Sequence, residues 1–405
     1  MDSLITAAGR ALAAGDVLGA LRRVALRNDA PALALRGLAM AQLGDLERAK
    51  ALLQRAARAF SGKEAVARAR CAVALAEIAL VSRDLNWPAR PLEHARDILE
   101  AHQDHLNSAH ARLLQVRRLV LIGRLEEAER LMRRLDPSPF TPGLRAAYEL
   151  TRAGIAIRHV RATAAKAALA RAKSAAQEGR IDALVAEIEA AACALRAPAA
   201  RLILRGVEQP LALEEVERFL ASDALIVDAC RHIVRRGSAV ISLSRRPVLY
   251  TLLRMLAEAW PGDAARRALV VRAFRGKQAD ESHRARLRVE MGRLRRALRS
   301  VARIDATAKG YALTTTSKGV VLLEQPFDGD HAALLALLSD GESWTSSALG
   351  LALGASQRSV QRALDTLAKA GKVQPVGRGP ARRWTAPPLP GITTALLLPI
   401  FASSD

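Results

Sequence analysis

The first 200 residues follow an apolar period that fits helices and is interrupted by a recurring turn. Apolar side chains are spaced three or four positions apart, as at Leu46, Ala49 and Leu53, which places them on one face of a helix. Ala, Leu and Arg dominate the region, and all three favour helix. A convincing alternation of apolar and polar residues, typical of half-buried strands, is missing from it. The sequence therefore predicts a long series of short helices.

The turns between these helices resemble one another. The segments 15–20, 44–49 and 123–128 each begin with Gly, continue with Asp or Arg, and end with Ala five residues later. Weaker copies lie at 82–85 and 160–162. Gly can end one helix in a left-handed conformation, and a small Ala lets the next helix pack closely. Gaps from 29 to about 40 residues between the turns are typical of helix–turn–helix repeats.

One of these turns resembles a known repeat family. Residues 41–49, Ala-Gln-Leu-Gly-Asp-Leu-Glu-Arg-Ala, are similar to the turn of a tetratricopeptide repeat, and Pro137 falls where such repeats often end a helix. The Trp and Tyr positions of the family are mostly aliphatic here. The resemblance implies a tetratricopeptide-like α-solenoid over 1–200 that offers a surface to a protein or peptide partner. An irregular helical bundle is the alternative that the periodicity leaves open.

The positive charge of the chain is concentrated in one segment. The chain carries 62 Lys and Arg against 40 Asp and Glu, a net charge of +22. Residues 237–322 hold 18 and 6 of these, a net +12, whereas 201–236 and 323–405 are neutral and the +10 of 1–200 is spread thinly. Such a concentration is typical of a surface that binds a polyanion. An aromatic content of 3% disfavours single-strand binding by base stacking.

A helix in the basic segment is apolar on one side and cationic on the others. Residues 281–301 predict this helix, with Leu287, Met291, Leu294 and Leu298 as its buried stripe. The elements that we expect around it are a strand at 239–243, helices at 247–260 and 264–274, and a hairpin at 303–313 around Lys309 and Gly310.

This layout resembles a family of DNA-binding domains. The segments 288–298 and 304–313 are similar to the recognition helix and wing of the C-terminal effector domain of OmpR/PhoB-type transcription regulators. The resemblance implies a winged helix with Arg286, Glu290 and Arg293 in the major groove and Lys309 near the minor groove. We expect DNA contacts from Arg284, Arg286, Arg288, Glu290, Arg293, Arg295, Arg296 and Lys309. Arg288 stands where the family often has Asp, and no receiver domain precedes, so control by aspartyl phosphorylation is not expected.

A second, neutral segment resembles the winged helix-turn-helix of many small bacterial repressors. Short helices are predicted at 331–338 and 344–353, a third from Ser356 to Ala370, and strands at 372–376 and 382–385. The resemblance implies DNA contacts from Gln357, Arg358, Ser359, Gln361, Arg362, Arg378, Arg382 and Arg383. Because this segment carries no net charge, its use as a dimerisation or protein-docking module stays open.

The patterns of several other protein classes are missing from the sequence. It has no phosphate-binding GxxxxGK[ST], no dinucleotide-binding GxGxxG after a strand, no HExxH and no GxSxG. His102 and His105 share a helix face, but no third ligand pattern supports a metal site. Cys71, Cys193 and Cys230 form no CxxC pair, which favours a reduced, cytoplasmic setting. We expect no enzyme activity, no cofactor, no metal, no membrane partner and no membrane span.

Together these patterns predict a mainly α protein, an α-solenoid of helical repeats followed by two tandem winged helix-turn-helix domains with small β-hairpin wings. The expected segments are the repeats at 1–200, a helical linker at 201–236, winged helices at 237–322 and 323–386, and a Pro-rich tail at 387–405. We expect a homodimeric transcription regulator that binds double-stranded DNA. The alternatives are a scaffold whose winged helices dock proteins, and a non-specific nucleoid or RNA binder.

Overall fold

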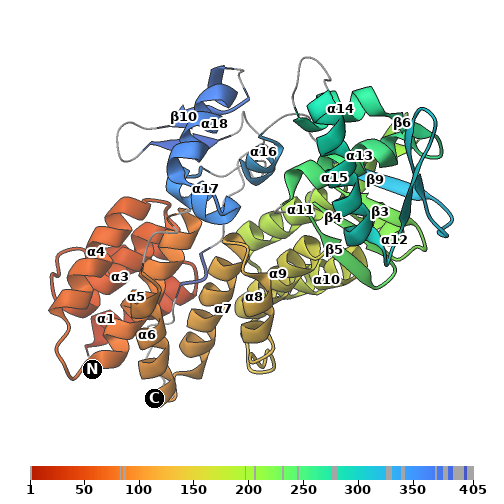
Figure 1. The fold of residues 1–405 in the computed structure, drawn as a ribbon. Helices are drawn as coiled ribbons and strands as arrows, with labels where there is room; N and C mark the ends of the chain where they lie inside the picture. Colours follow the sequence, from red (N-terminus) through yellow and green to blue (C-terminus); the bar gives the residue numbers. More distant parts are fainter. Residues whose placement is uncertain are drawn as a thin grey trace. The chain divides into compact units, whose positions relative to one another are not determined.

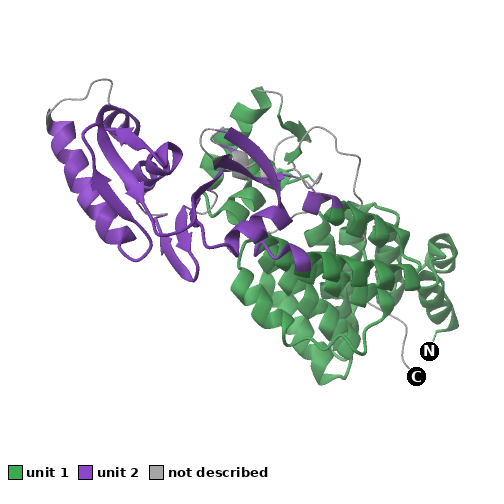
Figure 2. Cartoon of the chain, turned by 90° about the vertical axis from the view of Figure 1, so that its right-hand side faces the viewer, with its two compact units in different colours: residues 1–158, 164–192, 333–405 green, residues 159–163, 193–332 purple. Residues whose placement is uncertain are grey.

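The structure is a computed structural model, and it is mainly helical with small sheets (Figure 1). The residues that it describes are 2–82, 84, 88–196, 198–204, 207–229, 232–243, 246–274, 281–324, 331–338, 343–369, 372–376, 382–385 and 396–398. The chain divides into two compact units (Figure 2). The first unit comprises 1–158, 164–192 and 333–405, and the second comprises 159–163 and 193–332. The first unit therefore joins stretches that lie far apart in the sequence.

Helices from the N-terminal half make up most of the first unit. They are α1 (Ser3–Ala13), α2 (Val17–Val24), α3 (Ala30–Gln42), α4 (Leu46–Ala59), α5 (Ala65–Val81), α6 (Ala89–Ala101), α7 (His105–Leu121), α8 (Leu125–Met132), α9 (Pro142–Arg158), α10 (Ala162–Glu178) and α11 (Asp182–Arg196). From α1 to α9 each helix packs against the next, and α1, α3, α5, α7 and α9 also pack in succession. The predicted helical series is confirmed, and its odd-numbered helices stack on one another.

The glycine turns have the conformation that the sequence predicts. Gly15, Gly44 and Gly123 have φ of +81°, +85° and +76°, a left-handed conformation that favours glycine. After the first two of these, Asp16 and Asp45 cap the next helix, and their carboxylates accept backbone N–H bonds of 2.8 and 3.1 Å. The expected alanines Ala20, Ala49 and Ala128 are fully buried. Small side chains therefore let neighbouring helices approach closely.

Similar turns also occur where the left-handed position is not occupied by glycine. Gln103 and Arg180 adopt φ of +58° and +52°, and Val160, in one of the weaker copies, adopts +57°. The residue after Gln103, Asp104, donates its backbone N–H to the Leu99 carbonyl at 2.9 Å, as Asp16 does to Ala11 at 2.8 Å. The repeat is therefore more regular in backbone geometry than in sequence.

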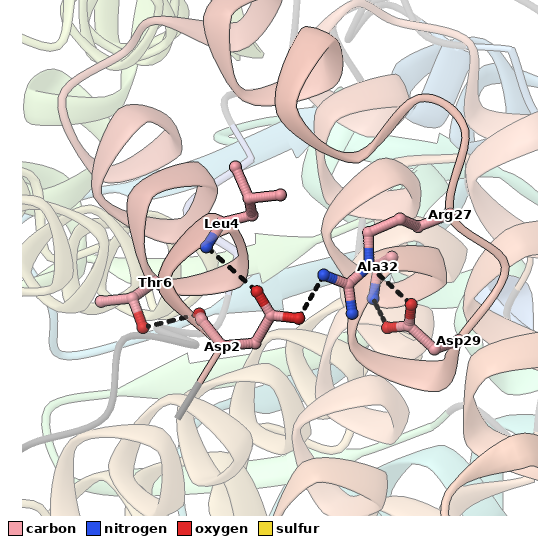
Figure 3. Close-up of polar contacts among 6 residues, drawn as sticks. All are labelled: Asp2, Leu4, Thr6, Arg27, Asp29 and Ala32. Carbon is pink, nitrogen blue, oxygen red and sulfur yellow. Dashed lines mark hydrogen bonds and ion pairs between the residues drawn. The ribbon is translucent and has the colours of Figure 1, made fainter.

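The start of the chain is held by a cluster of charges (Figure 3). Asp2 caps α1 and accepts the Leu4 N–H at 3.1 Å, while Asp29 caps α3. The Arg27 guanidinium binds both carboxylates, donating from Nε to Asp29 Oδ2 at 2.7 Å and from a second nitrogen to Asp2. Hydrogen bonding to Arg27 lowers the pKa of both aspartates. One side chain thus links the N-termini of two helices.

The C-terminal part of the first unit packs against the repeats. Its elements are α16 (Ala332–Leu338), α17 (Ser346–Leu353), α18 (Gln357–Lys369), β10 (Gln374–Val376) and β11 (Arg383–Thr385). The strands pair antiparallel, and Trp344 and Trp384 exchange backbone hydrogen bonds of 2.8 and 2.7 Å. One buried cluster contains these two tryptophans and Leu364 together with Val73 and Leu80 of α5 and other side chains of α6 and α7. The expected separate domain at 323–386 therefore shares its core with the repeats.

The second unit contains a mixed sheet. Its strands are β1 (Pro198–Leu204), β2 (Val207–Ala212), β3 (Leu225–Asp228), β4 (Ile233–Arg236), β5 (Ala239–Ser242) and β9 (Val320–Glu324), in the order β2-β1-β9-β3-β4-β5. β3 and β9 pair parallel, and the other neighbours pair antiparallel. Both central strands are buried throughout and apolar up to their last residues, Asp228 and Glu324, as expected for strands covered on both faces.

Three helices and a small sheet lie between β5 and β9 in the second unit. They are α13 (Pro247–Ala259), α14 (Arg266–Phe274), α15 (Glu281–Leu298), and a three-stranded sheet in the order β6-β8-β7, formed by β6 (Asp263–Ala265), β7 (Arg303–Ala306) and β8 (Gly310–Thr314). Side chains of these helices, of the small sheet and of β3 and β9 form one core. The predicted hairpin at 303–313 is confirmed, with its turn between Ala306 and Gly310.

The region between 198 and 236 differs from the prediction. We expected a helical linker at 201–236, but the structure has β1 to β4 and a single described helix there, α12 (Leu213–Leu220). The boundary that we expected at residue 200 falls inside β1. Residues 200–204 show no alternation of apolar and polar side chains that would predict a strand, and pairing with β2 and β9 stabilises them in this conformation. Residues 263–265, expected to begin a helix, instead form β6.

Candidate nucleic-acid interface

Helix α15 presents the predicted cationic surface in the second unit. Its stripe of Leu287, Met291, Leu294 and Leu298 is buried, with at most 2% of each residue exposed. The exposed positions carry Arg284, Arg286, Arg288, Arg293, Arg295 and Arg296, and Glu290 is half-buried. The 3.6-residue period turns the four apolar side chains into the core and therefore turns the arginines outward. The helix is anchored by its apolar side and is cationic on the rest.

Two arginines fasten the hairpin to the helices beside it. Arg295 of α15 donates from Nε to the Ile304 carbonyl at 2.8 Å, and its guanidinium lies 5.7 Å from the centre of the Tyr311 ring. Arg266 of α14 donates to the Thr307 and Ala308 carbonyls at 2.7 and 2.8 Å, also 5.7 Å from that ring. We expected Arg295 to contact DNA, but its Nε is used within the fold. The sequence did not single out Arg266, because its role depends on the contact between α14 and the hairpin turn.

The hairpin turn is built around Gly310. A Cβ at this position would lie 1.8 Å from the Ala264 carbonyl oxygen, so only glycine lets β8 approach β6. The Thr307 hydroxyl donates to Asp263 at 2.6 Å and accepts the Gly310 N–H at 2.8 Å. Lys309 is exposed in this turn. The tight turn therefore holds one cation at the tip of the hairpin.

Other arginines of α15 have partners within the unit. Arg286 stacks on Phe274, with its guanidinium 4.6 Å from the ring centre. Arg293 pairs with Glu290 at 2.7 Å, one helical turn away. Neither Arg284 nor Arg288 is without an interaction partner. These contacts limit the rotamers of the arginines while leaving their side chains exposed, which reduces the conformational entropy lost on binding a ligand.

A cationic cavity lies where α15 meets the start of α13. Its volume is about 630 Å³, and its lining includes Arg293 and Arg296 of α15, and Arg246, which precedes α13. Pro247 occupies the first position of α13 and Val248 and Leu249 also line the cavity. The first turn of a helix carries N–H groups without intrahelical partners and a partial positive charge. With Glu290 as the one acid among the lining residues, the cavity favours an anion such as a phosphate group.

The predicted contacts of α18 are mostly exposed. Gln357, Arg358, Ser359 and Arg362 are exposed and Gln361 is half-buried, while Val360, Leu364 and Leu367 form the buried side as predicted. The predicted turn before this helix is confirmed, because Gly354 has a φ of +62° and the Ser356 hydroxyl accepts the Ser359 N–H at 3.2 Å. Gln357 and Gln361 donate to Ser346 and Asp365, both at 3.2 Å.

Two of the arginines that we expected to contact DNA from the β10–β11 hairpin make contacts within the first unit. Arg383, which we expected to contact DNA, is half-buried and donates from one guanidinium nitrogen to the Ser82 carbonyl at the end of α5, so that nitrogen is used within the fold. Arg382 stacks on Trp384 at 4.3 Å and lies 3.8 Å from Asp365. Arg378 lies outside the described residues. The sequence could not reveal this arrangement, because Ser82 is 301 positions away from Arg383.

The described residues show neither a metal site nor a membrane-spanning helix. No group of three or more His, Cys, Asp or Glu is placed there to hold a metal ion. His102 Nδ1 lies 2.8 Å from the Ile98 carbonyl oxygen of its own helix, and His105 lies 3.8 Å from Glu100. Over the same ranges, no helix has both the length and the apolar content needed to cross a membrane.

Comparisons with known proteins add no assignment. No model of a protein family, no curated protein and no solved structure matches this chain. The functional argument therefore rests on the residues and contacts described above.

Proposed function

We propose that the chain is a DNA-binding transcription regulator that reads double-stranded DNA through α15. The observation that carries the proposal is the net charge of +12 over 237–322, together with the exposed arginines of α15, a helix in this segment that is anchored by its buried face. The order of α13, α14, α15 and the β7–β8 hairpin supports a winged helix, with α15 in the major groove and Lys309 near the minor groove.

Different arginines have different tasks in this proposal. Arg293, held by Glu290, is placed to reach base edges, where an arginine can bind guanine with two hydrogen bonds. Arg246 and Arg296 line the cavity at the start of α13 and bind a backbone phosphate there. Arg295 and Arg266 position the hairpin and do not need to touch DNA.

The repeats and the C-terminal segment take other roles. The stacked helices α1 to α9 are a tetratricopeptide-like α-solenoid in this proposal, offering a surface to a protein or peptide partner. A homodimer in the cytoplasm would place two copies of α15 on half-sites one or more helical turns apart. We propose no enzyme activity.

One observation favours a docking role for the C-terminal segment rather than a second DNA contact. The core of α16 to α18 is continuous with that of α5 to α7, and Arg383 bonds to the Ser82 carbonyl. A neutral segment also gains little from counterion release. The scaffold alternative therefore applies best to this part of the chain.

A gel-shift titration on genomic DNA fragments, repeated at several salt concentrations, tests the function. We expect the logarithm of the binding constant to fall linearly with the logarithm of salt. Arg293→Ala is expected to weaken binding to the preferred fragment by about 1–3 kcal/mol and to reduce sequence preference. Arg296→Ala is expected to weaken binding to all fragments equally and to reduce the salt slope by about 0.9.

Lys63→Ala is the matched control, because it removes one exposed positive charge from the first unit. Its binding is expected to equal that of the parent chain. Equal affinity of the parent for genomic and random DNA at physiological salt would contradict the proposal and favour the non-specific binder. Binding that does not depend on salt would favour the scaffold.

A further inference from the structure

A short apolar segment near the C-terminus lies among the N-terminal helices. Leu396, Leu397 and Leu398 have no regular secondary structure. Leu398 belongs to the buried cluster of α1 to α5, together with Ala8, Leu12 and Leu38, and Leu396 packs beside it. Leu397 packs against the separate cluster of α7 to α9, which includes Phe140 and Leu144. The segment therefore connects two hydrophobic cores that the repeat helices form separately.

A single buried carboxylate accepts two backbone hydrogen bonds from this segment. Glu77 of α5 is fully buried, and its two oxygens accept the N–H groups of Leu397 at 2.9 Å and Leu398 at 2.8 Å. Leu398 has a φ of +52°, a conformation that bulky residues rarely adopt. Successive N–H groups converge on one anion when a neighbouring residue is left-handed, as in the backbone nests that bind anions. The carboxylate therefore binds this segment through its peptide backbone.

The surroundings of Glu77 keep it charged for this task. His110 of α7 is buried, and its Nε2 lies 3.5 Å from Glu77 Oε2. Burial alone would raise the pKa of Glu77, but His110, the Leu397 N–H and Arg117 together bring it below its usual value. A buried carboxylate without such partners would be strongly destabilising. The peptide N–H groups are therefore part of what makes a charge at this position tolerable.

The walls around the segment leave room for leucine side chains. A cavity of about 700 Å³ adjoins the three leucines. Leu12, Leu35 and Ile181 are among the residues that line it. Gly143 keeps one wall bare, since a Cβ there would lie 3.2 Å from the Leu397 side chain and 2.8 Å from that of Ile181. The site combines an anion for two successive N–H groups with a cavity whose lining is apolar in part and adjoins the leucine side chains.

We propose that the repeat helices form a binding site for a short apolar peptide, centred on Glu77 and His110, and that residues 396–398 of the same chain are its resident ligand. The ligand class is a leucine-rich peptide recognised through two successive backbone N–H groups. The site lies in the first unit and does not depend on whether α15 binds DNA.

The test measures whether the site accepts a free peptide once the resident segment is removed. The probe is a fluorescein-labelled peptide with the sequence of residues 394–401, Thr-Ala-Leu-Leu-Leu-Pro-Ile-Phe, and the readout is fluorescence anisotropy on the full chain. Leu398→Asp places a charge in the apolar cluster and is expected to release the segment, so this variant should bind the probe at least tenfold more tightly than the parent. Adding Glu77→Ala to Leu398→Asp should abolish that gain.

Leu26→Asp is the matched control, because the same change is made at a leucine that is 98% exposed. This variant should bind the probe as weakly as the parent. The proposal is overturned if the parent binds the probe as tightly as Leu398→Asp does, or if Leu398→Asp keeps its helical circular dichroism and binds no probe.

Hydrogen exchange of the unmodified chain gives a second test that needs no release of the segment. The Leu397 and Leu398 amides should exchange at least tenfold more slowly than the same amides in the free peptide. Glu77→Gln, which keeps an acceptor but removes the charge, should speed their exchange. Exchange in the parent as fast as in the free peptide would overturn the proposal.

Discussion

Arg27 shows how a single side chain can join the ends of two helices. Its guanidinium binds Asp2, which caps α1, and Asp29, which caps α3 (Figure 3). Because the pKa of each aspartate is lowered in the folded chain, the stabilisation is present above the unfolded-state pKa and is lost as pH falls through the folded-state pKa. The contact is partly exposed, so salt also weakens it.

We predict that Arg27→Gln lowers the free energy of unfolding at neutral pH and that its difference from the parent shrinks as the solution is acidified below about pH 4. Urea titrations at several pH values measure this difference. Arg10→Gln, at an exposed arginine of α1, is the control and should stay close to the parent throughout. A difference for Arg27→Gln that does not change with pH would contradict the linkage.

The cysteines differ sharply in their surroundings. Cys71 is buried in the core of α1 to α5, and burial raises the pKa of its thiol to about 12. At pH 8 only about one thiol in ten thousand at such a site is a thiolate, the form that reacts. Cys193 is exposed.

We predict that iodoacetamide at pH 8 modifies Cys193 in the native chain and leaves Cys71 unmodified. Peptide mapping by mass spectrometry reads each position separately. In urea both should react, which is the control for the reagent. Equal labelling of Cys71 and Cys193 in the native chain would show that the core around α5 opens on the time scale of labelling.

At the scale of elements, α15 uses one set of residues to stabilise the fold and another for the proposed binding of DNA. Met291 is fully buried in its stripe, whereas Arg299, directly after the helix, is exposed. We predict that Met291→Ala lowers the free energy of unfolding by about 2–5 kcal/mol, since it leaves a cavity. Arg299→Ala should change it by less than about 0.5 kcal/mol. Denaturant unfolding followed by circular dichroism checks both, and similar effects of the two substitutions would contradict the orientation of the helix.

The turn at Gly44 tests the repeated link between helices. Its φ is +85°, and a Cβ there would meet no atom within 4 Å, so substitution adds backbone strain without a clash. We predict that Gly44→Ala lowers the free energy of unfolding by about 1–2 kcal/mol, and that Gly44→Asn lowers it less. Gly154→Ala is the control in thermal melts, because Gly154 lies within α9, also in open space, and alanine favours helix there.

At the scale of the whole molecule, the first unit is discontinuous in sequence. Residues 333–405 belong to it together with the N-terminal helices, and the shared core contains Trp344 beside side chains of α5, α6 and α7. Removing that segment would expose apolar side chains of the repeats to water, which is unfavourable in proportion to the area exposed.

We predict that a chain ending at residue 332 melts several degrees below the full chain, since a loss of 1 kcal/mol lowers the midpoint of a unit of this size by about 2–4 °C. Circular dichroism at 222 nm follows the repeat helices in both chains. A midpoint equal to that of the full chain would show that residues 333–405 form an independent domain, as the sequence pattern alone suggested.

Elements whose stability comes from local pattern could be predicted. The helices of the N-terminal half, the glycine turns, and the buried stripe of α15 follow from periodicity and from the conformations that Gly and Asp favour. The hairpin around Gly310 follows for the same reason. Each of these depends on residues within a few positions of one another.

Features that depend on distant partners could not be predicted. Strands β1 to β4 were missed because β1 and β3 both pair with β9, which lies more than 90 positions after β3. Strands β2 and β4 in turn pair with β1 and β3, so the conformation of all four depends on the assembled sheet. The engagement of Arg295 by Ile304, of Arg383 by Ser82 and of Leu398 by Glu77 likewise arises only when separate elements are packed together. Local patterns therefore decide which segments form helices and which of their faces are apolar or charged. Which charges remain available to a ligand, and which parts of the chain share a core, is decided by tertiary packing, because burial and hydrogen bonding depend on neighbours in space.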